Sequence, residues 1–126
     1  MSHSIKSFTD LVAWQKSHKF VVEIYKATLN FPSEEKFGLT SQLRRAGVSI
    51  TSNIAEGFGR RSVKEKSQFY AMAYGSLLEV QNQLLIARDV NILDSEQFKL
   101  LSELSVEATK LISGLRAANK KKESSS

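Results

Sequence analysis

The segment QLRRAGVSITSNIAEGFGRRS, residues 42–62, repeats apolar side chains at the spacing of an amphipathic α-helix. These positions recur every three or four residues and share one helical face: Leu43, Ala46, Ile50 and Ile54. Gly57 predicts the end of this helix, because glycine is common where helices stop. Ser62 and Glu65 form an S-x-x-E capping box that predicts the start of the next helix. The segment therefore predicts two helices joined by a short turn.

The same periodicity predicts a helix before this pair, from about Asp10 to Leu29, with Thr9 as its N-cap. Pro32 separates it from the second helix, because proline disfavours helical geometry in the residue before it. The third helix, which opens at the capping box, is expected to end near Asp89.

A fourth helix is predicted from a cap at Asp94 and Gln97, with an apolar stripe from Leu101 to Ala118. Four helices with short connections predict an all-α, up-down-up-down four-helix bundle. We expect this domain to span residues 1–118, and the basic, Ser-rich residues 119–126 to form a disordered tail.

Two of the predicted helices are apolar on two sides. The main stripe of the first helix comprises Leu11, Trp14, His18, Val21, Val22, Tyr25 and Leu29. Phe20 and Ile24 lie nearly opposite it, and Tyr70 and Tyr74 lie outside the main stripe of the third helix. A surface helix of a monomer normally has one apolar stripe. We expect these four residues to contact neighbouring subunits of a homo-oligomer; the alternative is that the bundle itself buries both faces.

Composition indicates one globular domain. The chain has 126 residues, of which 41% are hydrophobic and 25% charged. The absence of cysteine excludes disulfides and thiolate metal sites and favours a reducing compartment. The sequence shows neither a signal peptide at its start nor the roughly 18 consecutive apolar residues of a membrane span. We therefore expect a cytoplasmic location.

The net charge of +5 is unevenly distributed. Residues 36–66 contain seven basic and two acidic side chains (7 − 2 = +5), and residues 120–126 add 3 − 1 = +2. A basic segment of this kind suggests a polyanionic partner, whereas a contribution to general solubility is the alternative.

Catalytic and metal sites are not predicted. The histidines are His3 and His18, and neither has a second ligand at metal-binding spacing. Glu56 and Glu79 are expected to neutralise nearby arginines rather than to form a catalytic pair. Ser49, Ser52 and Ser76 lack a base with which to form a catalytic triad. We expect a non-enzymatic protein without metal or cofactor.

The connection from Gly57 to Ser62 has the properties of an anion site. Arg60 and Arg61 supply forked donors, Lys64 follows one turn later, and a helix begins here with its positive dipole end. Its glycines permit unusual backbone angles. We expect phosphate contact here, with a solvated hinge as the alternative.

Arg44 and Arg45 differ in their helical faces. Arg45 shares a polar face with Ser49 and Ser52, which favours contact with nucleic acid over a structural role. Arg44 lies near the line of Val48, which favours an ion pair at a subunit interface. Exposed interleaved aromatics that would stack bases are missing, so binding is expected to be electrostatic and weakly sequence-selective.

The segment at residues 42–62 resembles the signature of the 23S rRNA intervening-sequence protein family, also called the four-helix-bundle protein family. FTDLVAWQ at residues 8–15 and AYGSLLE at residues 73–79 agree with it, and the resemblance covers residues 8–115. Gly47 stands where relatives often have alanine, and Thr51 where many have proline.

The resemblance implies an up-down bundle that assembles into a ring-like homo-oligomer, typically a pentamer, with no enzymatic activity. Some members are encoded within bacterial rRNA genes, and others resemble the accessory variability protein of diversity-generating retroelements. We therefore expect a homo-oligomer that binds nucleic acid, RNA in particular, through the basic surface around the second helix and the loop after it. The alternative is a protein–protein adaptor whose basic residues form interface salt bridges.

Overall fold

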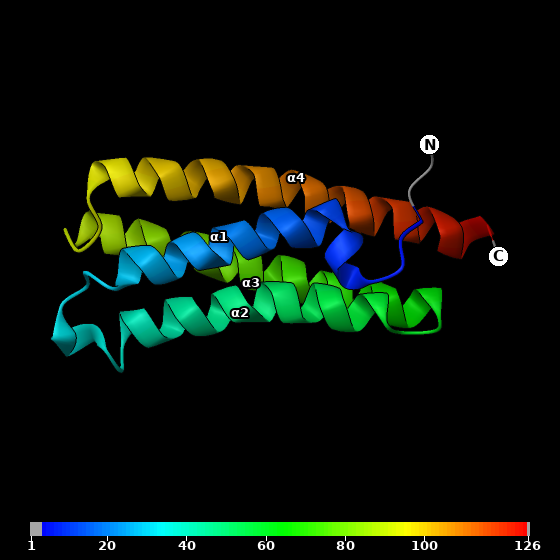
Figure 1. Cartoon of the computed structure of the whole chain (residues 1–126), viewed down its shortest axis with the longest axis horizontal. Helices are drawn as coiled ribbons and strands as arrows, with labels where there is room; N and C mark the ends of the chain where they lie inside the picture. The colour runs from blue at the N-terminus through cyan, green and yellow to red at the C-terminus, as the bar shows by residue number, and fades with distance from the viewer. Residues whose placement is uncertain (1–3, 126) are drawn as a thin grey trace.

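The computed structural model describes residues 4–125, and all regular structure within them is helical. The α-helices of this part of the chain are α1 (Val12–Thr28), α2 (Leu39–Phe58), α3 (Val63–Asp89) and α4 (Ser95–Ser125). Single 3-10 turns, Phe8–Asp10 and Ser33–Glu35, precede α1 and α2. The predicted all-α four-helix bundle is confirmed (Figure 1).

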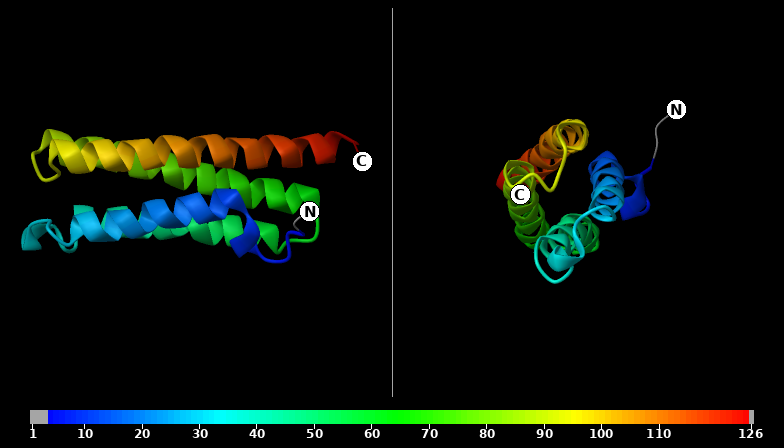
Figure 2. Two further views of the ribbon diagram at one scale, coloured as in Figure 1. Left: turned by 45° about the horizontal axis from the view of Figure 1, so that its top comes forward. Right: turned by 90° about the vertical axis from the view of Figure 1, so that its left-hand side faces the viewer.

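Each helix packs against two others. α2 contacts α1 and α3, and α4 contacts α3 and α1, so α1 and α3 lie diagonally opposite each other (Figure 2). The α1–α2 and α3–α4 connections lie at one end of the bundle. The α2–α3 loop and the C-terminal turns of α4 lie at the other end (Figure 1). No described helix combines the length and the apolar character needed to cross a bilayer.

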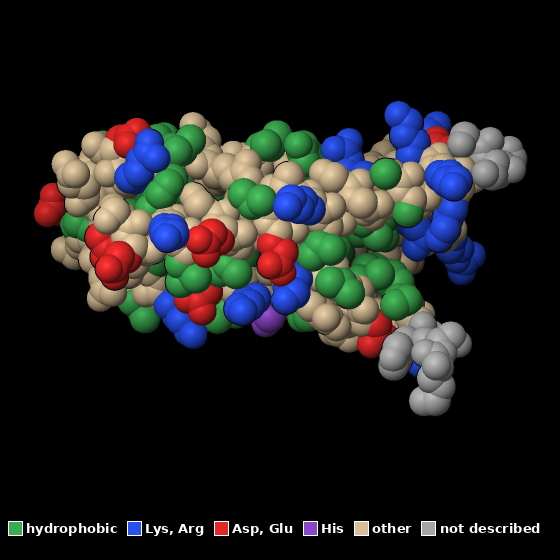
Figure 3. All heavy atoms as spheres, turned by 90° about the horizontal axis from the view of Figure 1, so that it is seen from above, with side chains coloured by type: hydrophobic (Ala, Val, Ile, Leu, Met, Phe, Trp, Pro, Cys, Tyr) green, Lys and Arg blue, Asp and Glu red, His purple; other side chains and the backbone are tan. Residues whose placement is uncertain are grey.

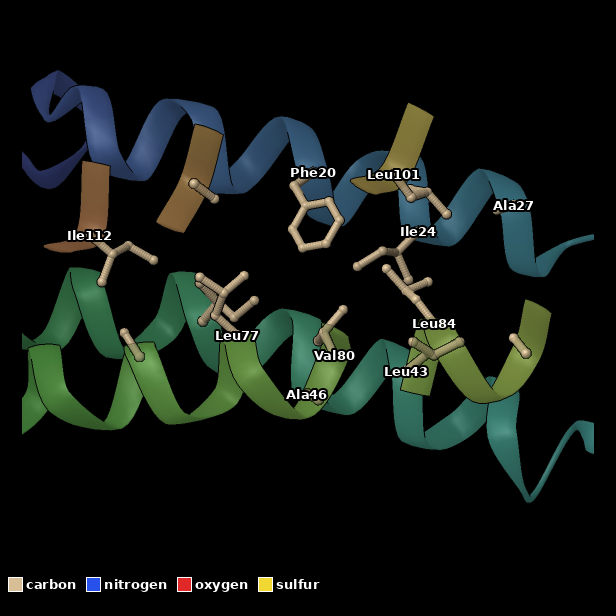
Figure 4. Packing of buried hydrophobic residues seen from close by; sticks show 14 of the residues in the cluster. Phe20, Ile24, Ala27, Leu43, Ala46, Leu77, Val80, Leu84, Leu101 and Ile112 are labelled. Atoms are coloured by element: carbon tan, nitrogen blue, oxygen red, sulfur yellow. The ribbon is translucent and has the colours of Figure 1, made fainter. Parts of the chain in front are cut away.

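All four helices contribute to one hydrophobic core. The four residues predicted for the apolar face of α2 are all buried, which confirms that part of the pattern. Figure 4 shows how α1, α3 and α4 meet them with Phe20, Ile24, Leu77, Val80 and Ile112, each of which is fully buried. Removal of this apolar surface from water is the main force that holds such helices together.

The predicted orientation of α1 is only partly correct. Phe20 and Ile24 are 0% exposed and lie in the core, so neither is available to a neighbouring subunit. Part of the predicted core stripe faces outward, with Tyr25 40% and Leu29 76% exposed, whereas Val21 of the same stripe is buried and Leu11 and Trp14 pack against the core. Small residues explain the choice of face, because they let α2 and α4 approach α1 closely. The small buried residues on this side of α1 are Ala13, Ser17 and Ala27.

Tyr70 on α3 was also predicted to contact another subunit and is instead buried, with 3% of its surface exposed. Tyr74 is half-buried and packs against the core. The apolar side chains that α3 does expose are Met72, Leu78, Leu85 and Ile86. Phe20, Ile24 and Tyr70 are therefore buried by the bundle itself, but the bundle does not bury both faces, because other apolar side chains of α1 and α3 stay exposed.

The helix boundaries were predicted with mixed success. The Oγ of Ser62 accepts a hydrogen bond of 3.0 Å from the Glu65 N–H, as predicted for the start of α3. Asp94 Oδ1 accepts one of 2.8 Å from the Gln97 N–H at the start of α4. Thr9 is not the cap of α1: Ser7 caps the preceding 3-10 turn, and its Oγ accepts from the Thr9 N–H at 3.2 Å.

The predicted end of the domain at residue 118 is wrong. α4 continues to Ser125, and Asn119, expected in a disordered tail, is only 6% exposed. The lysine-rich composition suggested disorder, but the helical register of α4 brings Asn119 back to the side that faces α3. Residue 126, the last of that predicted tail, lies outside the described residues.

Candidate nucleic-acid interface

The loop between α2 and α3 is short and continues from the helix before it. The Gly59 N–H donates to the Ala55 carbonyl oxygen at 3.3 Å, and the Arg60 N–H donates to that of Gly57 at 3.2 Å. Gly59 has a φ of −78°, and no described glycine has a positive φ. The loop therefore does not use the unusual backbone angles that its glycines permit.

Lys66 closes the C-terminal end of α2. Its Nζ donates to the carbonyl oxygen of Phe58 at 2.5 Å and lies 3.4 Å from that of Gly57. The same ammonium group lies 5.3 Å from the centre of the Phe58 ring. A cation is favourable here because the last carbonyls of a helix carry partial negative charge. Burial, and then the nearby charge of Lys122, lower the pKa of Lys66 from its ordinary value.

The three basic residues predicted at this loop are all exposed. The guanidinium carbon of Arg60 lies 4.5 Å from the centre of the Phe69 ring on α3. Such stacking orients a guanidinium while its N–H edge stays available to an anion. Within residues 4–125, Arg60, Arg61 and Lys64 form no ion pair with a carboxylate.

The last turns of α4 lie beside the start of α3. The side-chain amide of Asn119 donates to the Val63 carbonyl oxygen at 2.9 Å and to Ser67 Oγ at 2.7 Å. Val63 is the first residue of α3, so this contact fixes α4 next to the arginine loop. Arg116, Lys120, Lys121 and Lys122 therefore belong to the same end of the bundle as Arg60 and Arg61.

We call this cluster the basic end and define it by the following residues: Arg60, Arg61, Lys64, Lys66, Arg116, Lys120, Lys121 and Lys122. The acidic side chains near it in sequence are Glu56, Glu65 and Glu123, so its net charge is 8 − 3 = +5. This equals the net charge of the whole chain, so the other basic and acidic residues cancel. Figure 3 shows basic side chains gathered at this end of the molecule.

Arg45, predicted to share the nucleic-acid surface, lies elsewhere. It is exposed on α2, 13 residues before Phe58, and a helical rise of 1.5 Å per residue separates the two by about 20 Å. Its predicted polar face is partly used within the bundle, since the Oγ atoms of Ser49 and Ser76 are 2.8 Å apart between α2 and α3. The structure therefore does not bring Arg45 together with the loop arginines.

Arg44 joins α2 to α1 within the chain. Its Nε donates to Thr28 Oγ1 at 2.8 Å, and its Nη2 donates to the Tyr25 carbonyl oxygen at 3.4 Å. Its guanidinium carbon lies 4.7 Å from the centre of the Tyr25 ring. These contacts are made within the chain, and the ion pair expected for Arg44 at a subunit interface stays a prediction.

The carboxylates expected to neutralise the arginines do not do so. Within residues 4–125, neither Glu56 nor Glu79 forms an ion pair, and Glu79 accepts a hydrogen bond of 3.4 Å from Gln83. The prediction that they pair with Arg44, Arg45 or Arg60 is therefore wrong.

His18 lies on the exposed side of α1. Its ring stacks on that of Trp14, with 4.6 Å between the ring centres. Within residues 4–125, no group of three or more His, Asp or Glu side chains has the arrangement of a metal site. His3 lies outside the described residues.

Comparison with known proteins settles the family. Residues 9–114 match the 23S rRNA-intervening sequence protein family. The chain belongs to this family. The match spans all of α1, α2 and α3 and most of α4, which confirms the resemblance carried by the segment at residues 42–62.

A solved structure has the same fold as this intervening-sequence protein. It is a protein of unknown function from the S23 ribosomal protein family of Bacteroides thetaiotaomicron, with a TM-score of 0.75 and 26% sequence identity. The alignment covers 83% of this chain and 98% of that one. Comparison with curated proteins gives no match. Neither description names an enzymatic activity.

The match ends at residue 114, before the last turns of α4. Arg116, Asn119 and the three lysines after them therefore lie beyond the part of this intervening-sequence protein that its family describes. Sequence reasoning missed their role because a run of lysines and serines is typical of a disordered tail. The signal available was Asn119, which continues the three- and four-residue spacing of Ala108, Ile112 and Leu115.

Proposed function

We propose that this intervening-sequence protein is a non-enzymatic, homo-oligomeric nucleic-acid-binding protein whose ligand is RNA and whose basic end contacts the phosphate backbone. The observation that carries the proposal is the net charge of +5 at one end of the bundle. Arg60, Arg61 and Lys64 are exposed there without an internal ion-pair partner in the described part of the chain. The family description, with its reference to 23S rRNA, favours RNA over other polyanions.

The chemistry of the basic end suits backbone recognition rather than base recognition. Lysine and arginine neutralise phosphates and release condensed counterions, and this supplies affinity without sequence information. Single-stranded bases are usually held by exposed aromatic rings. Phe69, the ring nearest to the loop arginines, is already covered by Arg60. Binding is therefore expected to vary little between unrelated sequences.

Assembly is supported by two apolar surfaces on opposite sides of the bundle. One surface, on α1 and α2, exposes Val22, Tyr25, Leu29 and Val48. The other, on α3 and α4, exposes Leu78, Leu85 and Val106. We infer that one surface contacts the other on a second copy of the chain, because head-to-tail contacts of this kind form a ring when the rotation between copies closes. Repetition of the basic end around a ring would strengthen weak phosphate contacts through avidity.

The alternative adaptor function assigns the basic residues to salt bridges with a protein partner. Arg44 fits a structural role, because its hydrogen bonds and its stacking are both made inside the chain. Arg60, Arg61 and Lys64 do not share this pattern, and for that reason we favour nucleic acid. The adaptor hypothesis is tested by measuring the binding of this chain to an acidic protein, which it expects and the nucleic-acid proposal does not require.

The experiment compares the Arg60→Ala, Arg61→Ala double variant with a matched double variant of α4, Lys99→Ala, Lys110→Ala. Both remove two exposed positive charges, but only the first removes them from the basic end. RNA binding is measured by fluorescence anisotropy from about 50 to about 200 mM salt. We expect the arginine variant to bind more weakly and with a flatter salt dependence on every sequence tried, and the lysine variant to bind like the wild type. Equal effects of the two variants would contradict a localised site.

A further inference from the structure

We propose that the groove between the start of α3 and the end of α4 seats a backbone phosphate, with Arg116 and Lys120 as its ligands and Asn119 as the positioning residue. This inference rests on the proposed function and extends it from the α2–α3 loop to a second element. It assigns a role to the turns of α4 that follow residue 114, where the family match ends.

The groove is open to solvent and lies at the same end of the bundle as the arginine loop. It has a volume of about 290 Å³ and is lined by Ser67, Arg116, Ala117, Lys120 and Glu123. A water molecule occupies about 30 Å³ of liquid, so the groove has room for a phosphate group with part of its hydration shell. Ser67 lies on the second turn of α3. This helix begins at Val63, directly after the last residue of the loop, Ser62.

The two cations in the groove are placed on the same face of α4. Arg116 and Lys120 are four residues apart, a spacing that brings side chains together on one helical face. The guanidinium carbon of Arg116 lies 4.9 Å from the centre of the Tyr74 ring on α3. This stacking restrains the guanidinium group, and its N–H edges are left to form the paired hydrogen bonds that phosphate accepts.

Asn119 holds this face in place. The last turn of a helix has unpaired carbonyl groups and tends to fray unless something fixes it. The Asn119 amide uses both of its N–H groups on α3, one on Val63 and one on Ser67, and it is almost completely buried. The charges of α4 are therefore held against the start of α3, at the same end of the bundle as Arg60 and Arg61, before any ligand binds, which reduces the entropy lost on binding.

Glu123 gives the proposal a second, opposite test. Ser67 Oγ donates to Glu123 Oε2 at 3.4 Å, so this carboxylate lies at the edge of the groove. A carboxylate repels a phosphate. Removal of its charge is therefore expected to strengthen binding, whereas removal of the charge of Arg116 or Lys120 is expected to weaken it.

The test measures anisotropy of a labelled single-stranded RNA of about 20 nucleotides with the full chain and four variants. The variants are Arg116→Gln with Lys120→Gln, Glu123→Gln, Asn119→Ala, and the control pair Lys99→Gln with Lys110→Gln. Each phosphate contact contributes about 0.7 to the slope of log K against log salt for a single strand, so the first variant, which removes both ligands of the one phosphate, is expected to reduce the magnitude of the slope by about 0.7. Glu123→Gln is expected to increase affinity, and the control pair to leave the slope unchanged.

Asn119→Ala separates positioning from charge, because it leaves the net charge unchanged. We expect it to weaken RNA binding and to speed amide hydrogen exchange in residues 119–123. If it speeds exchange but leaves binding unchanged, the groove has no positioned site and the proposal is wrong. The mutated side chains Arg116, Lys120 and Glu123 are exposed, so their variants are expected to keep the circular dichroism of the wild type.

The possible results separate the proposal of a phosphate seat in the groove from the proposed function in RNA binding. If the wild type binds RNA and loses binding with the Arg60, Arg61 variant but not with the Arg116, Lys120 variant, the groove is not a phosphate seat and the proposed function stands. If the wild type does not bind RNA, the proposed function fails and the groove proposal fails with it. If the wild type binds only an acidic protein, the adaptor alternative replaces both.

Discussion

Gly57 of α2 lies directly against the ring of Tyr70 on α3. A Cβ atom at Gly57 would lie 2.7 Å from Tyr70 Cε1 and 2.9 Å from Phe69 Cβ, closer than real Cβ atoms approach. Gly57 is thus a position where α2 and α3 approach each other closely just before the arginine loop. It lies inside α2, which ends at Phe58, and does not end the helix as the sequence suggested.

We predict that Gly57→Ala destabilises the protein although alanine favours helices. The gain in helix propensity is about 1 kcal/mol, whereas overpacking at a close contact typically costs about 1–3 kcal/mol. Phe69 Cβ cannot move away without a shift of the α3 backbone, so the clash is expected to prevail. Urea denaturation measures the free energy of unfolding.

Gly75 and Gly114 supply the matched control. Both lie exposed within helices, and a Cβ atom at either would meet nothing within 4 Å. Gly75→Ala and Gly114→Ala are therefore expected to raise the free energy of unfolding by up to about 1 kcal/mol each. The same sign for all three substitutions would contradict the role given to the contact between Gly57 and Tyr70.

The buried faces of α2 and α1 show how much of the fold could be predicted from the sequence. Spacing alone identified α2 and its buried residues, because Leu43, Ala46, Ile50 and Ile54 form a single stripe on an otherwise polar helix. α1 has two apolar stripes, and the larger side chains suggested as the core a stripe that is only partly buried. The face that is buried depends on which side lets α2 and α4 come close, and periodicity within one helix does not contain that information.

We predict that the burial of Tyr70 makes the free energy of unfolding fall at alkaline pH. Burial raises its pKa above the ordinary value of 10.0, so the folded state keeps the phenol protonated at pH values where the unfolded chain ionises it. This stabilisation is fully present below about pH 10 and is lost as pH rises through the folded-state pKa. Tyr70→Phe removes the ionisable group. Between about pH 9 and about pH 11, the variant is therefore expected to lose less free energy of unfolding than the wild type.

Urea titrations of both proteins at those two pH values make the comparison. Both retain Lys66 and the other titrating groups, so the difference between them reports Tyr70. Equal losses in the two proteins would mean that Tyr70 ionises as freely in the folded state as in the unfolded chain.

Lys66 is a second group whose pKa shift makes the free energy of unfolding depend on pH, and its contribution changes with pH in the opposite direction to that of Tyr70. Its pKa is lowered first by burial and then by the charge of Lys122, so the folded state releases this proton before the unfolded chain does. The contribution of Lys66 to stability therefore rises with pH, between its folded-state pKa and its ordinary value of 10.5. We predict that Lys122→Gln moves the pKa of Lys66 part of the way back, because burial remains. NMR titration of the Lys66 Cε resonance measures it.

Lys121→Gln, which removes the neighbouring charge of the same sign, serves as the control for Lys122→Gln. Only the Lys122 variant is expected to change the pKa of Lys66 appreciably. An unchanged pKa in that variant would show that the end of α4 does not approach the start of α3 as described.

The candidate site was less predictable than the fold. Arg60, Arg61 and Lys64 were found from sequence because they are contiguous and precede or open a helix. Arg45 was expected on the same surface but lies about 20 Å from the loop, because it precedes the end of α2 by 13 residues. Its contact with nucleic acid stays a prediction. From sequence, Lys66 was considered only as part of the net charge of residues 36–66. Its hydrogen bond to the Phe58 carbonyl oxygen could not be predicted, because it depends on how α3 turns back along α2.

Assembly is predicted to depend on the exposed apolar surfaces rather than on Phe20 and Ile24. Leu29→Glu or Leu85→Glu is expected to reduce the mass measured by light scattering while helical content stays the same. Phe20→Glu is expected to unfold the chain, because it buries an unpaired charge in the core. The mass of the wild-type protein measured by light scattering is expected to be a multiple of the 14.1 kDa of one chain. The family resemblance implies a pentamer of about 70 kDa (5 × 14.1).

Val90→Glu provides the control for these variants. Val90 is 55% exposed at the C-cap of α3 and belongs to neither of the two apolar surfaces as defined, so its substitution is expected to leave the mass unchanged. A wild-type protein that is monomeric at micromolar concentration would contradict the assembly proposal, whatever the variants do.

The most direct test of the account is the affinity of the wild-type protein for RNA as a function of salt. A basic end that acts on phosphates must release counterions, so the observed association constant is expected to fall linearly with salt on logarithmic axes between about 50 and about 200 mM. The fall is expected to have a similar slope for unrelated RNA sequences. The absence of RNA binding even at about 50 mM salt would contradict the account and assign the basic end to a protein partner instead.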